Sequence, residues 1–337
     1  MQMRAVVLHE PRVWRVEAVE RPDSGPNDVV IKVGASGLCG TDLKIFAGEY
    51  LSPYPLIPGH EMAGTIVSVG ANVSSDYLNR RVGVDPTLSC GHCEFCQATE
   101  FNHCESWGAV GDTRDGGFAE YVSVPVANVH VLPDAFSFNL GAIAEPVACA
   151  VWALERIKPK FGGLALIFGA GPMGLILSRL IQQAGFLDAV VVDQSASRLE
   201  QVRAVGVLNA IHTDQLGELG YAHPHGFDLV VDATGVPTVF SQAIPWVRKN
   251  GQLLLFGVAP RGALTPIEPY LIYHNEITIV SSMAINHSYG GALNILRHRS
   301  QDFAGLVTHR LGLADYGKAI DLVLHGQGIK VQVEPEQ

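Results

Sequence analysis

Four cysteines stand close together in one short stretch of the chain, at Cys90, Cys93, Cys96 and Cys104. Their spacing, C-x2-C-x2-C-x7-C, suits a tetrahedral zinc ion whose four positions are all filled by thiolates. Such a site leaves no position for a substrate, so it braces the chain and does not react. Residues 85–107 show no sustained period of two or of 3.6, which predicts a lobe held by the metal in place of a core. Two disulfides or a redox pair are the weaker alternatives.

Four further residues of metal-ligand type lie in three separate segments next to glycine or proline. Cys39 lies between Leu38 and Gly40, the pair His60 and Glu61 follows Pro58-Gly59, and Glu145 precedes a proline. Taken singly, each is more often an ordinary core or loop residue. Together they supply one thiolate, one imidazole and two carboxylates, which is enough for a second zinc site with room for an exchangeable ligand.

A glycine-rich turn follows the apolar run Leu164–Phe168, and a helical pattern follows the turn. This is the strand-turn-helix context in which G-x-G-x-x-G binds a dinucleotide, because the helix N-terminus offers free N–H groups and a positive dipole end to the phosphates. The turn consists of Gly169, Ala170, Gly171, Pro172, Met173 and Gly174.

An acidic residue, Asp193, comes nineteen positions after Gly174 and directly after a second apolar run. A carboxylate there accepts hydrogen bonds from a ribose 2′-hydroxyl and repels a 2′-phosphate, so NAD is favoured over NADP. The nearby Arg198 would soften that preference. The alternative interpretation is a surface turn followed by a helix-capping aspartate.

The sequence pattern changes near residue 148. Before it, short β-like runs broken by glycine and proline predict an antiparallel, barrel-like domain; they include Ala5–Leu8, Val29–Val33, Gly64–Val69 and Tyr121–Val124. After it, apolar runs alternate with helical patterns, which is typical of a doubly wound parallel sheet. The later strands are expected at Leu164–Phe168, Ala189–Val192, Phe227–Asp232, Leu253–Phe256 and Ile277–Val280, and the helices from the glycine turn through Ala184 and over Ser197–Val205. We expect the chain from about Met283 onward to return to the first domain.

The composition of the 337 residues is that of a globular protein, with 47% hydrophobic and 17% charged residues. A formal net charge of −10 argues against nucleic acid or an anionic membrane surface as the main partner. We find neither a signal peptide nor an apolar stretch long enough to span a membrane. Thiols that are free to bind metal point to the reducing cytoplasm.

With these motifs in hand, the chain resembles the zinc-dependent medium-chain dehydrogenases, and within them the polyol branch that contains sorbitol dehydrogenase. The resemblance runs nearly end to end. It rests on the four-cysteine lobe, Cys39–Asp42, His60-Glu61, Gly116–Tyr121, Glu145-Pro146, and the glycine turn with Asp193. It implies a GroES-like, barrel-type catalytic domain over residues 1–147 and 284–337, a Rossmann NAD-binding domain over 148–283, and an active site in the cleft between them.

The resemblance also implies roles for single residues in a hydride transfer between NAD and a substrate hydroxyl. Cys39, His60 and Glu61 would hold the catalytic zinc, and Glu145 would bind it directly or through a water molecule. Thr41 stands where the family places a hydroxyl that passes on the substrate proton; its alternative role is a local backbone cap. Many relatives have a histidine relay at the position of Lys44, which leaves a relay, a substrate contact and plain surface charge open for this lysine.

The leading functional hypothesis is therefore an NAD-dependent enzyme with two zinc ions per chain that converts a polyol to a ketose, or the reverse. A threonine-type or small secondary alcohol dehydrogenase is the sister hypothesis. A nucleotide-sensing binding protein on the same fold is the non-enzymatic one, and the retained zinc ligands argue against it. Relatives are homodimers or homotetramers, and Ile277–Val280 is expected to be an edge strand that could pair across subunits.

Overall fold

The computed structural model describes residues 1–50, 52–303 and 305–337, which divide into two compact units. The first unit comprises Met1–Ala148, Ala284–Phe303 and Val307–Gln337, and the second comprises Cys149–Met283 with the short stretch 305–306. The chain from Ala284 to the C-terminus thus belongs mostly to the first unit. No helix among the described residues is both long enough and apolar enough to cross a membrane.

The first unit is built on a seven-stranded sheet in the order β16-β17-β3-β4-β5-β9, with β8 also paired to β3. Apart from the parallel pair β16 and β17, the described strand pairs of this unit are antiparallel, as the interrupted β-like runs predict. The sheet strands are β3 (Asp28–Gly37), β4 (Glu61–Val69), β5 (Arg81–Val84), β8 (Tyr121–Pro125), β9 (Val129–Val131), β16 (Val307–Leu311) and β17 (Lys330–Val333). Two separate two-stranded sheets pair β1 (Gln2–Glu10) with β2 (Val13–Glu20) and β6 (Thr87–Leu88) with β7 (Gly108–Ala109).

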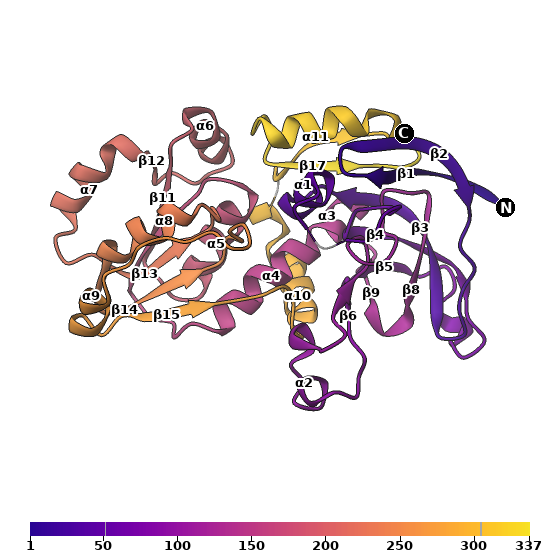
Figure 1. Ribbon diagram of the computed structural model, residues 1–337, viewed down its shortest axis with the longest axis horizontal. Coiled ribbons are helices and arrows are strands. Elements are labelled where there is room, and N and C mark those ends of the chain that lie inside the picture. The colour runs from indigo at the N-terminus through magenta and orange to yellow at the C-terminus, as the bar shows by residue number, and fades with distance from the viewer. Residues whose placement is uncertain (51, 304) are drawn as a thin grey trace. The chain divides into compact units, whose positions relative to one another are not determined.

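A buried cluster of branched side chains fills the interior of this sheet, with Val29, Ile31 and Val33 of β3 alternating toward it. The C-terminal strand β17, yellow in Figure 1, pairs antiparallel with β3 and places Gln332 opposite Gly37. The helices of the unit are α1 (Gly40–Ala47), α2 (Glu94–Gln97), α3 (Phe138–Ala142), α10 (Tyr289–Arg299) and α11 (Tyr316–Leu324), while α4 (Ala144–Glu155) begins in the first unit and continues into the second.

The second unit is a six-stranded, wholly parallel sheet in the order β12-β11-β10-β13-β14-β15. Its strands are β10 (Leu164–Phe168), β11 (Asp188–Asp193), β12 (Ala210–His212), β13 (Phe227–Asp232), β14 (Val247–Leu255) and β15 (Thr278–Ser281). The strand order reverses between β10 and β13, and ligands of such sheets bind at that point, beyond the carboxyl ends of the strands. The predicted doubly wound sheet is therefore confirmed, strand by strand, for all five expected runs.

Helices follow the strands of this sheet, as Figure 1 shows. They are α5 (Pro172–Gln183), α6 (Ala196–Ala204), α7 (Leu216–Ala222), α8 (Pro237–Ala243) and α9 (Pro269–His274). The helical patterns predicted through Ala184 and over Ser197–Val205 match α5 and α6 within one residue at each observed end. The short strand β12 carries no strong sequence signal and was not anticipated.

Candidate functional site

The sulfur atoms of the cysteine lobe are arranged as a single metal would require. Cys90 Sγ lies 3.9 Å from Cys96 Sγ, and Cys93 Sγ lies 4.0 Å from Cys104 Sγ. Four sulfurs about 2.3 Å from one zinc ion at tetrahedral angles would stand about 3.8 Å apart. A disulfide would need about 2.05 Å, and all six cysteines are free.

The surroundings of the lobe fit the same interpretation. Backbone N–H groups donate to two of the sulfurs: Cys90 N to Cys104 Sγ at 3.2 Å, and Cys93 N to Cys90 Sγ at 3.4 Å. Among the described residues, Phe101 and Trp107 are the partly buried apolar side chains that pack against the cysteines. Because this cluster is too small to hold a lobe by itself, a structural metal would supply the missing stabilisation.

A second group of ligand atoms belongs to the first unit and joins Cys39, His60 and Glu61, whose ligand atoms all lie within 4.8 Å of one another. Cys39 precedes α1, and its N–H donates to Asp42 Oδ2 at 2.8 Å, which fixes the start of the helix. Glu61 is the first residue of β4, and His60 directly precedes the strand. His60 and Glu61 are buried and Cys39 is partly buried, so the cluster has the protected character of a metal site.

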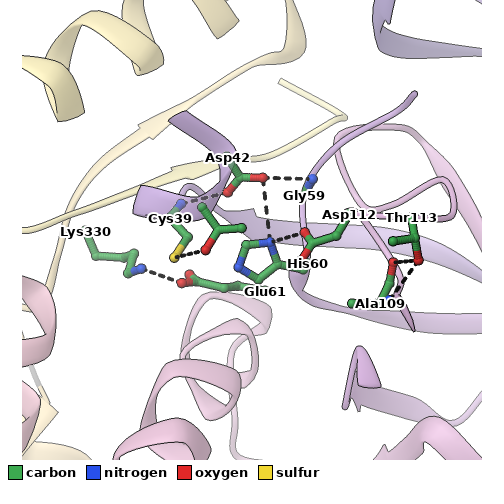
Figure 2. Close-up of polar contacts among 10 residues, drawn as sticks. Cys39, Asp42, Gly59, His60, Glu61, Ala109, Asp112, Thr113 and Lys330 are labelled. Atoms are coloured by element: carbon green, nitrogen blue, oxygen red, sulfur yellow. Dashed lines mark hydrogen bonds and ion pairs between the residues drawn. The ribbon is translucent and has the colours of Figure 1, made fainter. Parts of the chain in front are cut away.

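Two carboxylates face the Nδ1 atom of His60, as Figure 2 shows: Asp112 Oδ1 at 3.2 Å and Asp42 Oδ1 at 3.7 Å. Asp42 also accepts a hydrogen bond from Gly59 N at 3.1 Å. Burial raises the pKa of Asp42 to about 6. Burial alone would lower the pKa of His60, but the two aspartates raise it well above its ordinary value. Because the two carboxylates lie beside Nδ1, a single ring proton is favoured on that nitrogen, which leaves Nε2 as the nitrogen for a metal.

The carboxylate of Glu61 is oriented by a lysine that the sequence analysis did not identify. Lys330 Nζ lies 2.6 Å from Glu61 Oε1, while Glu61 Oε2 is buried with no hydrogen-bond partner among the described residues. A buried acceptor without a donor is costly, so its natural partner is a cation beside Cys39 and His60. The donor set of thiolate, imidazole and carboxylate fits zinc.

The other residues expected at this site lie as follows. Glu145 stands in the first turn of α4, 7% exposed, and is not part of the tight three-residue cluster. Its charge nevertheless contributes to raising the pKa of Lys330, so it belongs to the same electrostatic environment. Thr41 Oγ1 lies 4.0 Å from Cys39 Sγ. Lys44 is half-buried in the last turn of α1.

Asp112 and Lys330 are the residues that the sequence reasoning missed. Asp112 lies in the loop that precedes the Gly116–Tyr121 motif. It is a buried residue in a turn, and nothing in the neighbouring sequence indicates that it would lie beside His60. Lys330 lies 269 residues from its partner. Only strand pairing between β17 and β3 brings it near the cluster.

The glycine turn lies in the second unit between β10 and α5, where the parallel sheet reverses. A Cβ atom at Gly174 would lie 1.8 Å from the carbonyl oxygen of Gly169, so only glycine permits this approach of helix and turn. Asp193 accepts hydrogen bonds from Ala170 N and Ser195 N, each at 2.8 Å. Arg198 Nη1 lies 3.9 Å from Asp193 Oδ2.

A cavity of about 1340 Å³ opens beside this turn and is lined by Gly169, Gly171, Asp193 and Arg198 among others. A Cβ at Gly171 would meet no atom within 4 Å, so the backbone there is open to a close ligand. The turn begins α5 with Pro172 in its first turn and Gly171 as the N-cap, which leaves the free N–H groups directed toward an anion. These features fit the pyrophosphate and ribose of a nicotinamide dinucleotide.

Comparison with known proteins identifies two family regions in this chain. Residues 25–134 match the alcohol dehydrogenase GroES-like domain, and residues 172–297 match the zinc-binding dehydrogenase domain. The chain is 35% identical to D-arabinitol dehydrogenase 1 of Uromyces fabae, covering 99% of this chain and 97% of that protein. It is 34% identical to D-altritol 5-dehydrogenase of Agrobacterium fabrum, covering 87% and 88%. L-threonine 3-dehydrogenase of Idiomarina loihiensis is 30% identical, covering 96% and 97%.

Solved structures agree with these sequence relationships. A structure described as a zinc-binding dehydrogenase from Sinorhizobium meliloti 1021 bound to NADP superimposes with a TM-score of 0.94 at 29% identity, covering 99% of this chain and all of that one. A structure described as a short chain alcohol dehydrogenase from E. coli CFT073 in complex with NADH gives a TM-score of 0.91 at 28% identity, covering 99% of both chains. The predicted combination of a GroES-like domain with a Rossmann domain is thereby confirmed.

Proposed function

Because this chain belongs to the zinc-dependent medium-chain dehydrogenases, we propose that it oxidises a secondary alcohol of a polyol to the ketone with NAD, or catalyses the reverse reaction. The observation that carries the proposal is the Cys39–His60–Glu61 cluster with its buried, unpartnered Glu61 oxygen. A protein that only sensed the nucleotide would not need this cluster. The polyol is favoured because D-arabinitol and D-altritol dehydrogenases are more similar to this chain than the threonine enzymes are.

The residues of the cluster would share the work as follows. Cys39 Sγ, His60 Nε2 and Glu61 Oε2 would hold a zinc ion, and Glu145 would be the exchangeable carboxylate. When bound, zinc supplies a Lewis acid that lowers the pKa of the substrate hydroxyl, which allows hydride to leave to the nicotinamide. Asp42 and Asp112 keep the proton on His60 Nδ1, so the imidazole stays in one tautomer.

Other residues would transfer the proton and bind the cofactor. Thr41 would accept the substrate proton on its hydroxyl and pass it on, and Lys44 would stand at the exit of that path. The N–H groups at the start of α5 bind the pyrophosphate, and Asp193 accepts from the ribose hydroxyls. We expect NAD to be preferred over NADP, and two zinc ions per chain, one in each cysteine-containing site of the first unit.

The assembly we expect is a homodimer or homotetramer. β15 lies at the end of the strand order of the parallel sheet, so one of its edges is available for pairing with a second copy. Sedimentation of the purified protein measures the assembly directly, and a monomer at all concentrations would contradict this expectation. We also expect the protein in the cytoplasm, which fractionation of the host cells would test.

The decisive experiment compares His60→Ala with Glu145→Ala. His60→Ala should lose one of two zinc ions and nearly all turnover, because a fixed ligand is gone. Glu145→Ala should keep much of its zinc and still lose turnover. Both should bind NADH as the wild type does, because the glycine turn belongs to the other unit. Two zinc ions with normal turnover in His60→Ala would overturn the site.

Substrate class is tested separately on the wild-type enzyme. Pentitols, hexitols, tetritols and inositols are offered with NAD, and L-threonine and small secondary alcohols are offered beside them. A polyol should give the highest kcat/KM. A clear preference for L-threonine would move the enzyme to the threonine-type alternative, and no turnover with any of them would favour the nucleotide-sensing alternative.

A further inference from the structure

Lys330 is a buried cation beside the Cys39–His60–Glu61 cluster. Its side chain is 2% exposed, and that of Glu61 is 1% exposed. Its Nζ lies 2.6 Å from Glu61 Oε1 and donates to Leu38 O at 3.4 Å. A lysine is rarely buried to this degree unless a charged partner holds it, because removing an ammonium from water is costly.

The chain places Lys330 there by its tertiary fold. Lys330 is the first residue of β17, which pairs antiparallel with the end of β3. The same end of β3 pairs with β4, so that Gly37 stands opposite Glu61. The last strand of the protein therefore delivers a positive charge to the start of β4, as Figure 2 shows.

The two oxygens of Glu61 have different surroundings. Oε1 accepts the charge-assisted hydrogen bond from Lys330, whereas Oε2 is buried without a hydrogen-bond partner among the described residues. A Cβ at Gly37 would lie 2.0 Å from Oε2, so this orientation of the carboxylate requires glycine at that position. Lys330 binds Oε1, and the absence of a side chain at Gly37 leaves room for Oε2. Glu61 is thus held in one orientation, with one oxygen left for a metal.

Charge adds a second effect to this geometry. The Lys330 ammonium and the Glu61 carboxylate form a buried ion pair, with Nζ 2.6 Å from Oε1. The positive charge therefore lies directly beside the carboxylate that would bind the metal. Its charge opposes that of a divalent ion, so the lysine competes with the metal for Glu61.

We propose that Lys330 is a positioning residue of the catalytic metal site. Lys330 restricts Glu61 to a single ligand oxygen and lowers the affinity of the site for zinc. This rests on the proposed function, since it concerns the same metal. A carboxylate released from the lysine could offer both oxygens, and the site would then hold zinc more tightly and with altered coordination. Weaker binding through one carboxylate oxygen suits a zinc site that must exchange a ligand for the substrate.

The test compares Lys330→Met, which keeps the stem and removes the charge, with Lys330→Arg, which keeps a charge. Lys318→Met on the exposed side of α11 is the matched control. Each variant is loaded with zinc and titrated with a chelator, and each is also loaded with Co²⁺ for its visible spectrum. We expect Lys330→Met to need about tenfold more chelator to release the second zinc, and to show changed Co²⁺ bands. Lys330→Arg should approach the wild type, and Lys318→Met should equal it.

A purely structural role would lower the melting temperature of Lys330→Met and leave both metal readouts unchanged, which would overturn the proposal. Weaker retention of zinc would overturn it too. If Lys330→Met does not fold, the double variant Lys330→Met/Glu61→Gln is compared with Glu61→Gln alone, because the double variant leaves no buried charge unpaired. Equal Co²⁺ spectra with stronger zinc retention in the double variant support the proposal. Equal zinc retention in the two variants refutes it. Absence of a second zinc from the wild type would instead refute the proposed function.

Discussion

Replacing Asp193 by asparagine tests the coenzyme site most directly. Asp193 ends β11 and is 7% exposed. Its Oδ2 accepts from Ala170 N and its Oδ1 from Ser195 N, each at 2.8 Å. Asparagine keeps the shape and one acceptor oxygen but removes the charge. Its NH2 group would face one of the two backbone N–H groups, so the melting temperature must be measured beside the coenzyme preference to separate the structural effect from the electrostatic one.

The expected magnitudes follow from the two coenzymes. A hydrogen bond to a charged acceptor is about 1 kcal/mol stronger than one to a neutral acceptor. Two ribose hydroxyls therefore lose about 2 kcal/mol, which is about a 30-fold weaker binding of NADH. A carboxylate about 4 Å from a 2′-phosphate charge repels it by about 4 kcal/mol at an effective dielectric constant of 20, and this penalty disappears in the variant.

The assay is kcat/KM with NAD and with NADP at low and at high salt. We expect Asp193→Asn to shift the ratio toward NADP by at least about 100-fold, after screening has reduced the repulsion. Glu200→Gln, which removes one charge from the exposed side of the neighbouring helix α6, should leave the ratio nearly unchanged. An unchanged ratio in Asp193→Asn at an unchanged melting temperature would refute the assignment of this carboxylate to the ribose.

Two further predictions concern stability. Cys93→Ser should remove one zinc ion and lower the melting temperature, with turnover lost only as folding fails; loss of turnover at an unchanged melting temperature and metal content would contradict a structural lobe. Burial alone would raise the pKa of Asp228, but Lys160, Leu164 N and Arg248 hold it below its ordinary value. Its stabilisation is therefore present above about pH 4 and is lost as the pH falls through the lowered pKa. Asp228→Asn should lower the melting temperature at pH 7, corresponding to about 1–3 kcal/mol in stability, and should lower it less near pH 3. An equal loss at both values, measured by scanning fluorimetry, would exclude this ionic role.

The chemistry of the site could be predicted from sequence where it depends on local spacing. The four cysteines lie within fifteen residues, and the glycine turn lies between a strand and a helix that have their own patterns. Ligand type and turn conformation are local properties, so their residues could be named in advance. The parallel strands were predictable for a similar reason, because a strand buried on both faces is a continuous apolar run.

The electrostatics of the candidate catalytic site could not be predicted in this way. The sequence singled out Cys39, His60 and Glu61 as ligands and included Asp42 in a motif, but it did not identify Asp112, which faces His60 Nδ1, or the lysine that holds Glu61. A lysine in a short C-terminal strand looks like any other surface charge in sequence. Its position 2% exposed, beside a residue 269 positions away, depends on the pairing of β17 with β3.

The sequence by itself thus determined the kinds of ligand, the turn for the dinucleotide and the class of each domain. The tertiary structure alone decided which oxygen of Glu61 is left for a metal and which nitrogen of His60 faces the two aspartates. The physical reason is the sequence separation between the groups that interact. Backbone conformation and ligand chemistry depend on neighbours in the chain, whereas the partner of a buried charge is chosen by whichever strand the fold brings beside it.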